Sequence, residues 1–135
     1  MLYTMKQVCE KTGMTYEGLK FYCNQGLVPR IGRDKNNYRV FDEAMVRWIG
    51  DLNCLKKCNM SLAEMKTYLA LCLEGRPSIP ERLTMIAEKR KELEEKKKEL
   101  DESIAYIDWK ENLYHNILSG KTPYVSNLIK TEDGE

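Results

Sequence analysis

The residues of this chain with the most reactive side chains are its five cysteines. Cys54 and Cys58 lie four positions apart, so on a helix their thiols share one face, as two ligands of a metal ion would. No Cys-x-x-Cys pair and no glycine-rich phosphate loop accompany them, and His115 is the single histidine. We therefore predict no enzyme, no metal site and no cofactor, with a thiol oxidoreductase built on Cys54 and Cys58 as the enzymatic alternative.

Cys54 is the candidate for a thiol that senses reactive molecules. Arg47 lies seven positions earlier, on the same face of an expected helix, and Lys56 follows closely. Cations near a cysteine favour its reactive thiolate form. Alkylation, oxidation or nitrosation of this thiol would change volume and polarity at a domain junction. The alternative is a structural thiol, the interpretation that suits Cys9 and Cys72 as small apolar residues.

A second chemical feature is the basic character of the N-terminal third. The whole chain of 135 residues carries a net charge of only +1, which does not by itself indicate a nucleic-acid partner. Residues 1–39, however, hold seven Lys or Arg residues against three Asp or Glu residues. This third of the chain is therefore the part expected to face phosphate.

The elements that must position these residues are mostly helices. Thr4 is expected to cap a helix that runs to about Lys11, and Thr15 a second helix that ends before Gly26. Two short helices joined by a glycine-containing turn match a helix-turn-helix. The turn-forming stretch 33–37, between residues 28–31 and the alternating segment 38–41, predicts a basic hairpin that would serve as a wing. A plain solvated turn is the alternative.

Two further helices and one long helix follow. Asp42 is expected to cap residues 43–58, and Ser61 with Glu64 forms a capping box that opens a helix to about residue 73. Residues 74–77 are the clearest break. From Ile79 to about Ser119 there is no glycine, so we predict one long helix.

The long helix carries a repeat of alternating three- and four-residue steps, of which eight of eleven positions are apolar. Such a repeat is typical of a coiled coil, and a second copy of the chain is the simplest partner; a lone charged helix is the alternative. In a parallel dimer Arg90 would face Arg90, at a cost on the order of 1 kcal/mol or more. In an antiparallel dimer whose paired positions sum to 201, Arg90 faces Glu111. We therefore predict an antiparallel dimer with this seam: Leu83, Ile86, Arg90, Leu93, Lys97, Leu100, Ile104, Ile107, Glu111, Tyr114 and Leu118.

The sequence thus predicts a mainly α fold, with a winged helix-turn-helix DNA-binding domain followed by a long antiparallel coiled-coil dimerisation helix. The expected domains are residues 1–75 (DNA binding), 76–119 (dimerisation) and 120–135 (a short tail). No apolar run approaches the ~20 residues of a membrane span, and the first residues lack the pattern of a signal peptide. A cytoplasmic location with no membrane partner is expected.

The amino-acid sequence of residues 2–75 resembles that of the MerR family of bacterial transcriptional regulators. The residues that carry the resemblance are YTMKQVCEKTGMTYEGLKFYCNQGLVP, NNYRVFDE and MSLAEM. The stretch from Asp51 to Lys110, with Cys54 and the segment Gly75–Arg82, is similar to the AdhR/NmlR branch, which responds to aldehyde and nitrosative stress. The chain departs from the family pattern at Lys20, usually arginine, at Cys23, usually glutamate, and at Asn37, usually glycine but a residue that tolerates a positive φ.

The resemblance implies a homodimer that binds the over-long spacer of a promoter. It also implies that the dimer activates transcription by distorting the spacer, which brings the promoter elements on either side into phase for RNA polymerase. The polymerase would thus be a partner only indirectly, through the promoter DNA. Base or phosphate contacts are expected from the helix after Thr15, from the hairpin and from the end of the 43–58 helix. The lysines are alternatively solubilising charges, Tyr16 alternatively packing, and Tyr22 alternatively core. Alternatives for function are a regulator that responds to a small non-covalent ligand, with structural cysteines, and a coiled-coil adaptor without DNA. The candidate contacts are Thr15, Tyr16, Glu17, Lys20, Arg33, Lys35, Lys56 and Lys57, with Tyr22, Tyr38 and Arg39 implied by the family.

Overall fold

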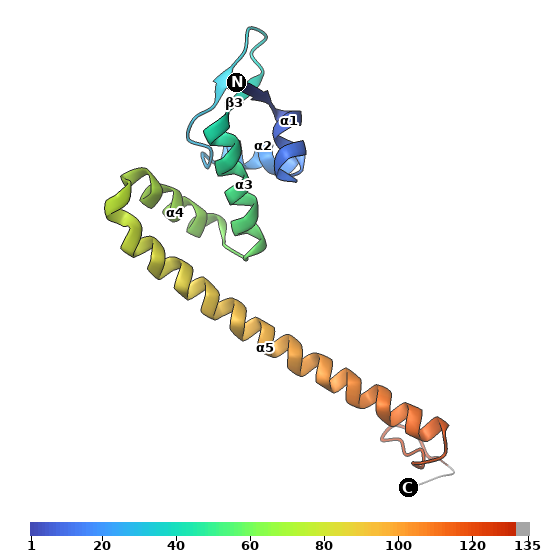
Figure 1. Ribbon diagram of the computed structural model, residues 1–135. Helices are drawn as coiled ribbons and strands as arrows, with labels where there is room; N and C mark the ends of the chain where they lie inside the picture. Colours follow the sequence, from blue (N-terminus) through green and yellow to red (C-terminus); the bar gives the residue numbers. More distant parts are fainter. Residues whose placement is uncertain (132–135) are drawn as a thin grey trace. The chain divides into compact units, whose positions relative to one another are not determined.

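The computed structural model describes residues 1–131 and contains a winged helix-turn-helix followed by a long C-terminal helix (Figure 1). This confirms the predicted mainly α fold. In chain order the elements are β1 (Leu2–Thr4), α1 (Met5–Thr12), α2 (Tyr16–Asn24), β2 (Gly32–Arg33), β3 (Arg39–Asp42), α3 (Glu43–Lys57), α4 (Leu62–Glu74), the 3-10 turn η1 (Arg76–Ser78) and α5 (Ile79–Leu118).

Helices α1 and α2 begin and end where the caps predict. The Thr4 hydroxyl accepts from the backbone N–H of Gln7, whose side chain accepts in return from the Thr4 N–H. Gly13 ends α1 with a φ of 76°, a left-handed conformation that glycine adopts without strain. The Thr15 hydroxyl then accepts from the Gly18 N–H at 3.0 Å and fixes the start of α2. These local bonds set the turn between the two helices.

The wing is part of a three-stranded antiparallel sheet with the order β1-β3-β2. The β2–β3 hairpin confirms the predicted wing, while β1 was not predicted. Tyr3 pairs with Phe41, and Gly32 pairs with Val40. The N-terminal strand therefore ties the base of the wing to the start of α1.

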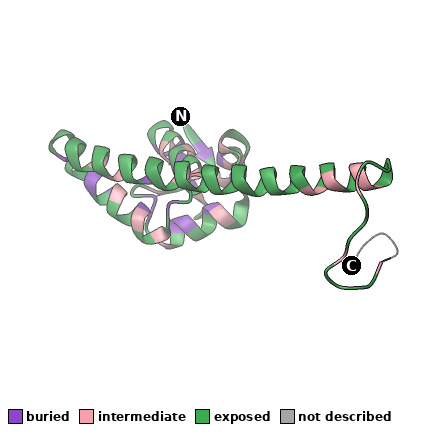
Figure 2. Ribbon diagram, turned by 90° about the horizontal axis from the view of Figure 1, so that it is seen from below, coloured by how far each residue is buried: buried purple, intermediate pink, exposed green. Residues whose placement is uncertain are grey.

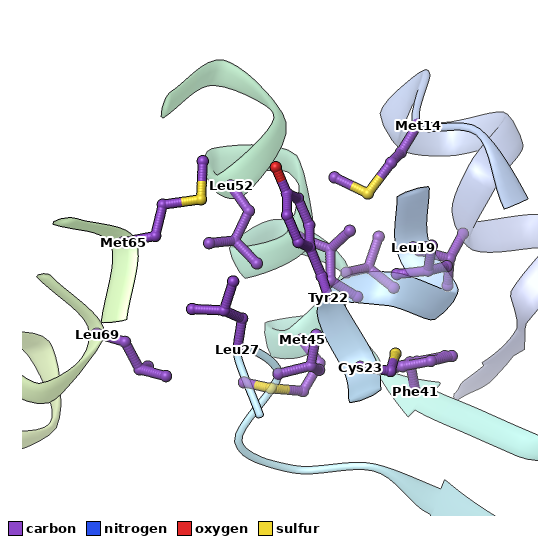
Figure 3. Close-up of a cluster of buried hydrophobic side chains, with 14 of the residues drawn as sticks. Met14, Leu19, Tyr22, Cys23, Leu27, Phe41, Met45, Leu52, Met65 and Leu69 are labelled. Atoms are coloured by element: carbon purple, nitrogen blue, oxygen red, sulfur yellow. The ribbon is translucent and has the colours of Figure 1, made fainter. Parts of the chain in front are cut away.

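A single apolar core holds α1 to α4 together (Figure 3). Trp48 of α3 donates its indole N–H to the Leu27 carbonyl at 2.8 Å and stacks on Tyr68 of α4. Asn53 donates to the Thr12 carbonyl at 3.0 Å, which attaches α3 to the end of α1. Each large apolar side chain buried here contributes about 1.5–3 kcal/mol. The fully buried ones are Val8, Leu19, Leu27, Phe41, Ile49, Leu52 and Met65.

The corner between α4 and α5 is fixed by polar contacts. Ser78 is only 1% exposed, and its hydroxyl bonds to the carbonyls of Leu71 and Gly75. Arg82 donates to the Ser78 hydroxyl at 2.9 Å and to the Gly75 carbonyl at 2.8 Å. This buried network holds the first turn of α5 against the end of α4.

Lys89 attaches the next part of α5 to the turn between α3 and α4. Its ammonium is 3.3 Å from the carbonyl of Asn59 and 3.2 Å from a carboxylate oxygen of Glu64. The chain accordingly divides into two compact units, Met1–Arg90 and the part from Lys91 onward. The first three turns of α5 thus belong to the same unit as the winged helix-turn-helix, which is called the head below.

The rest of α5 is almost entirely exposed (Figure 2). Its 40 residues form one uninterrupted helix, as the sequence predicts. Within residues 1–131, no helix is both long enough and apolar enough to cross a membrane.

Candidate nucleic-acid interface

Helix α2 presents one polar face and one apolar face. Leu19, Tyr22 and Cys23 are buried in the core. Tyr16, Glu17 and Lys20, with the capping residue Thr15, are exposed in the first part of the helix. An exposed polar face at the N-terminal half of the second helix is what a helix-turn-helix needs to enter the major groove.

The wing is held in shape by Asp34. Its carboxylate accepts from the N–H groups of Asn36 and Tyr38, at 2.8 and 3.0 Å. Asn37 takes a φ of 66°, the left-handed conformation that asparagine tolerates. These bonds leave Lys35 exposed at the turn and Tyr38 70% exposed beside it.

Four of the predicted contact residues line one hollow of about 340 Å³ between the wing and the helices. Tyr16 comes from α2, and Arg33, Tyr38 and Arg39 come from the wing. The start of α1 contributes Lys6, which the sequence analysis missed because nothing in the local pattern separates it from other exposed lysines. Three cations and one carboxylate therefore surround the hollow, which Thr4, Met5, Asp34 and Asn37 complete.

Arg39 is the most constrained of these cations. It is half-buried, and one of its terminal nitrogens donates to the side-chain oxygen of Asn24 at 2.7 Å. Within the described residues its buried Nε has no hydrogen-bond partner. A guanidinium held in place by Asn24 and lining the hollow is suited to an anion such as a phosphate.

The other predicted contacts lie outside the hollow. Tyr22 is only 7% exposed, so it packs in the core, which was the alternative to a DNA contact. This burial raises the pKa of its phenol. Its neighbour Phe21 is the exposed aromatic ring of the pair. Lys56 and Lys57 are exposed in the last turn of α3, at the far end of that helix from the wing.

The cysteines differ in their surroundings. Cys54 is exposed on α3, whereas Cys58 is half-buried at the end of the same helix. Cys23 is buried, and burial raises the pKa of its thiol although Arg39 and Arg33 act in the opposite direction. Burial also raises the pKa of Cys9. Among the described residues, no three His, Cys, Asp or Glu side chains gather where they could hold a metal ion.

The predicted seam lies along α5 as one exposed stripe. Seven of its eight apolar side chains are exposed in the single chain, and Leu93 is half-buried. Arg90, Lys97 and Glu111 are exposed between them.

A winged helix-turn-helix head with a basic hollow, followed by a long helix with an exposed apolar stripe, defines a class of DNA-binding regulators. The chain matches the family model described as "MerR HTH family regulatory protein" over residues 3–72, and the one described as "MerR, DNA binding" over residues 53–109. The chain belongs to the MerR family and is a DNA-binding transcriptional regulator, not an enzyme.

Individual relatives agree with this assignment. An HTH-type transcriptional regulator of Haemophilus influenzae is 35% identical over 91 residues, which cover 67% of this chain and 67% of that protein. AdhR, an HTH-type transcriptional regulator of Bacillus subtilis, is 31% identical over 85 residues, which cover 63% of this chain but only 61% of AdhR.

Solved structures are similar over more of the chain. HiNmlR, described as a MerR family regulator lacking the sensor domain, was solved bound to promoter DNA. It matches with a TM-score of 0.77 and 30% identity, over 88% of this chain and 90% of its own. A MerR family regulator from Listeria monocytogenes matches with a TM-score of 0.76 and 26% identity, over 87% of this chain and 89% of its own.

Proposed function

We propose that this regulator binds promoter spacer DNA as an antiparallel homodimer and activates transcription by distorting that DNA. In this proposal residues 1–75 bind DNA, residues 76–119 dimerise and residues 120–135 form a tail. The observation that carries it is the combination of a basic hollow on the head with an apolar stripe on α5 that one chain leaves exposed.

Phosphate is the proposed occupant of the hollow. Lys6, Arg33 and Arg39 line the hollow and supply positive charge there. The proposed contacts to bases come from Tyr16, Glu17 and Lys20. The capped N-terminus of α2 is in addition a favourable place for a phosphate of the DNA. Further contacts to the sugar-phosphate backbone of the DNA are proposed for Thr15, Lys35, Lys56 and Lys57.

DNA binding is tested by fluorescence anisotropy with duplexes that carry the promoter spacer, over a series of salt concentrations. Arg33→Ala removes one phosphate contact, so it is expected to weaken binding and to lower the slope of log affinity against log salt by about 1. Lys98→Ala removes an exposed cation of α5 and is the matched control, expected to leave the slope unchanged. Equal slopes for both variants would exclude the hollow as a phosphate site.

The antiparallel arrangement is tested by charge exchange in the seam. Arg90→Glu places two glutamates opposite each other and is expected to weaken the dimer, as measured by sedimentation equilibrium. Adding Glu111→Arg restores opposite charges only if position 90 faces position 111 of the partner. In a parallel dimer the double variant would be as weak as the single one, and the proposal would be wrong.

Distortion of the DNA is tested by transcription in vitro from promoters that differ in spacer length. The protein is expected to activate a promoter with an over-long spacer and not one whose spacer is already of ordinary length, because bending and untwisting help only the first. Equal activation of both would indicate direct recruitment of RNA polymerase instead.

Cys54 is the proposed sensor of thiol-reactive stress. Support comes from its exposure on α3, compared with the buried Cys23 and the half-buried Cys9, Cys58 and Cys72. Exposure matters because an electrophile must reach the sulfur. Cys54→Ser is expected to abolish the transcriptional response to an aldehyde, and Cys58→Ser to preserve it. An undiminished response in Cys54→Ser would instead favour a regulator with structural cysteines and a non-covalent ligand.

A further inference from the structure

Phe21 is an exposed apolar side chain on α2, the helix that the proposed function places in the major groove. It is 47% exposed and lies in the last turn of the helix. The other exposed side chains of α2, those of Tyr16, Glu17, Lys20 and Asn24, all carry hydrogen-bonding groups. Single apolar side chains are common on protein surfaces, so the informative fact is the place of Phe21 among these residues.

Phe21 lies on the same side of α2 as two of the proposed base contacts. Glu17 is one helical turn before it, and Lys20 is the preceding residue. At about 100° per residue, the three side chains fall within about 100° of one another around the helix axis. The buried Leu19 and Tyr22 project into the core instead. The DNA surface that Glu17 and Lys20 contact in the proposed function therefore extends to Phe21.

The ring of Phe21 is supported by its surroundings. Its centroid lies 6.0 Å from that of the Tyr22 ring, with the two planes tilted by 49°. Tyr22 is itself buried in the core. The Phe21 carbonyl accepts from the N–H of Gln25 at 2.9 Å, at the end of the helix. Backbone and ring are thus both held in place, which reduces the conformational entropy lost when the ring contacts DNA.

The chemistry of a phenyl ring limits what Phe21 can recognise in DNA. The ring has neither a hydrogen-bond donor nor an acceptor, so it cannot bond to a phosphate or to a polar base edge. The major groove also presents an apolar group, the 5-methyl group of thymine, and phenylalanine is among the side chains that contact it. Burying the ring and the methyl group against each other removes both from water, which is favourable.

We propose that Phe21 reads a thymine of the DNA site by contact with its 5-methyl group. The inference rests on the proposed entry of α2 into the major groove, and it names the base that this helix prefers at one position. In the proposed homodimer the contact occurs once in each half-site. Phe21 thus gives α2 an apolar criterion for sequence beside the polar ones of Glu17 and Lys20.

The test is fluorescence anisotropy with the full-length protein and duplexes that carry the promoter spacer. Each thymine is replaced in turn by deoxyuridine, which pairs in the same way and lacks only the methyl group. At one thymine of each half-site, the unaltered protein is expected to bind the uracil duplex about fourfold more weakly, the factor that corresponds to burying one carbon group. Equal affinity for every uracil duplex would overturn the inference.

Variants of Phe21 assign this loss of affinity to the ring. Phe21→Ala is expected to bind the thymine and uracil duplexes equally at the sensitive position, and Phe21→Leu, which keeps an apolar side chain, to retain a preference for thymine. Tyr106→Ala removes an exposed aromatic ring of α5 outside the seam and is the matched control, expected to keep the full preference. The ratio of the two affinities is the informative quantity, because a variant that is only less stable binds both duplexes more weakly by the same factor.

The remaining outcomes separate this inference from the proposed function. A preference for thymine that persists in Phe21→Ala would come from the deformability of the DNA and would overturn the inference. A protein that binds none of the spacer duplexes would contradict the proposed function, and the inference would fail with it. Binding that weakens with salt but is indifferent to the methyl group would leave the proposed function in place and contradict the role of Phe21 alone.

Discussion

At the scale of single residues, the turn of the wing depends on an asparagine in the left-handed conformation that glycine adopts most easily. Asn37 holds a φ of 66° at the turn, where most residues with a Cβ are strained. Its carbonyl accepts from Arg33 at 3.1 Å, and its N–H donates to the Asp34 carbonyl at 2.9 Å. The conformation of one asparagine therefore positions Arg33, one of the cations of the hollow.

Replacing Asn37 tests this dependence. Asn37→Val is expected to reduce the free energy of unfolding by about 1–2 kcal/mol, because a β-branched residue is strained at positive φ. Asn37→Gly accepts the same φ without strain and is expected to change stability little. Urea unfolding measures both. A similar loss for the two variants would show that the side chain of Asn37, and not its backbone conformation, supports the wing.

At the scale of elements, Glu64 serves two helices at once. It caps α4 by accepting from the Ser61 N–H at 2.8 Å, and it pairs with the Lys89 ammonium of α5. Lys89 is buried, so its charge needs these partners. The Ser61 N–H first, and the Lys89 ammonium second, hold the pKa of Glu64 below its usual value.

This pKa shift predicts a loss of stability in acid. A carboxyl whose pKa is lower in the folded state stabilises the fold above its unfolded pKa, near 4.3, and that contribution is lost as the pH falls through the folded pKa. Thermal melts from pH 7 to pH 3 are therefore expected to show a smaller decline for Glu64→Gln than for the unaltered protein. Glu95→Gln, an exposed glutamate of α5, is expected to follow the unaltered protein. Parallel curves for all three proteins would contradict the coupling.

At the scale of the whole molecule, two copies are expected to share the stripe on α5. Ile107 belongs to the predicted seam and Tyr106 does not, yet in the single chain they are 54% and 56% exposed. Substitutions at these two positions can therefore be compared as one inside and one outside the seam, at nearly equal exposure.

Dimerisation makes the melting temperature depend on protein concentration, because dilution favours dissociation. The unaltered protein and Tyr106→Asp are expected to melt at higher temperature as concentration rises. Ile107→Asp places a charge in the apolar seam and is expected to lose this dependence and to sediment as a monomer. A dimer that tolerates Ile107→Asp would place the interface on another face of the helix.

The parts of the fold that local chemistry decides were predictable. Caps such as Thr15 and Asp42 fix helix starts through bonds within three residues. Strand β1 was missed because its conformation comes from pairing with β3, about forty residues away. Lys6 was missed because its local pattern is that of any exposed lysine, and only the folded chain brings its segment to the hollow. For Tyr22, residue type suited both burial and contact, and only the packing of α2 decided its position.

The unbroken α5 also restricts how such a protein changes length during evolution. One inserted residue turns everything after it by about 100° around the helix axis, so the apolar stripe would leave the partner's side. Insertions of seven residues keep the stripe nearly in phase and lengthen the helix by about 10.5 Å. That is close to three base pairs at about 3.4 Å each. In the proposed dimer, spacing along the DNA would therefore evolve in discrete steps.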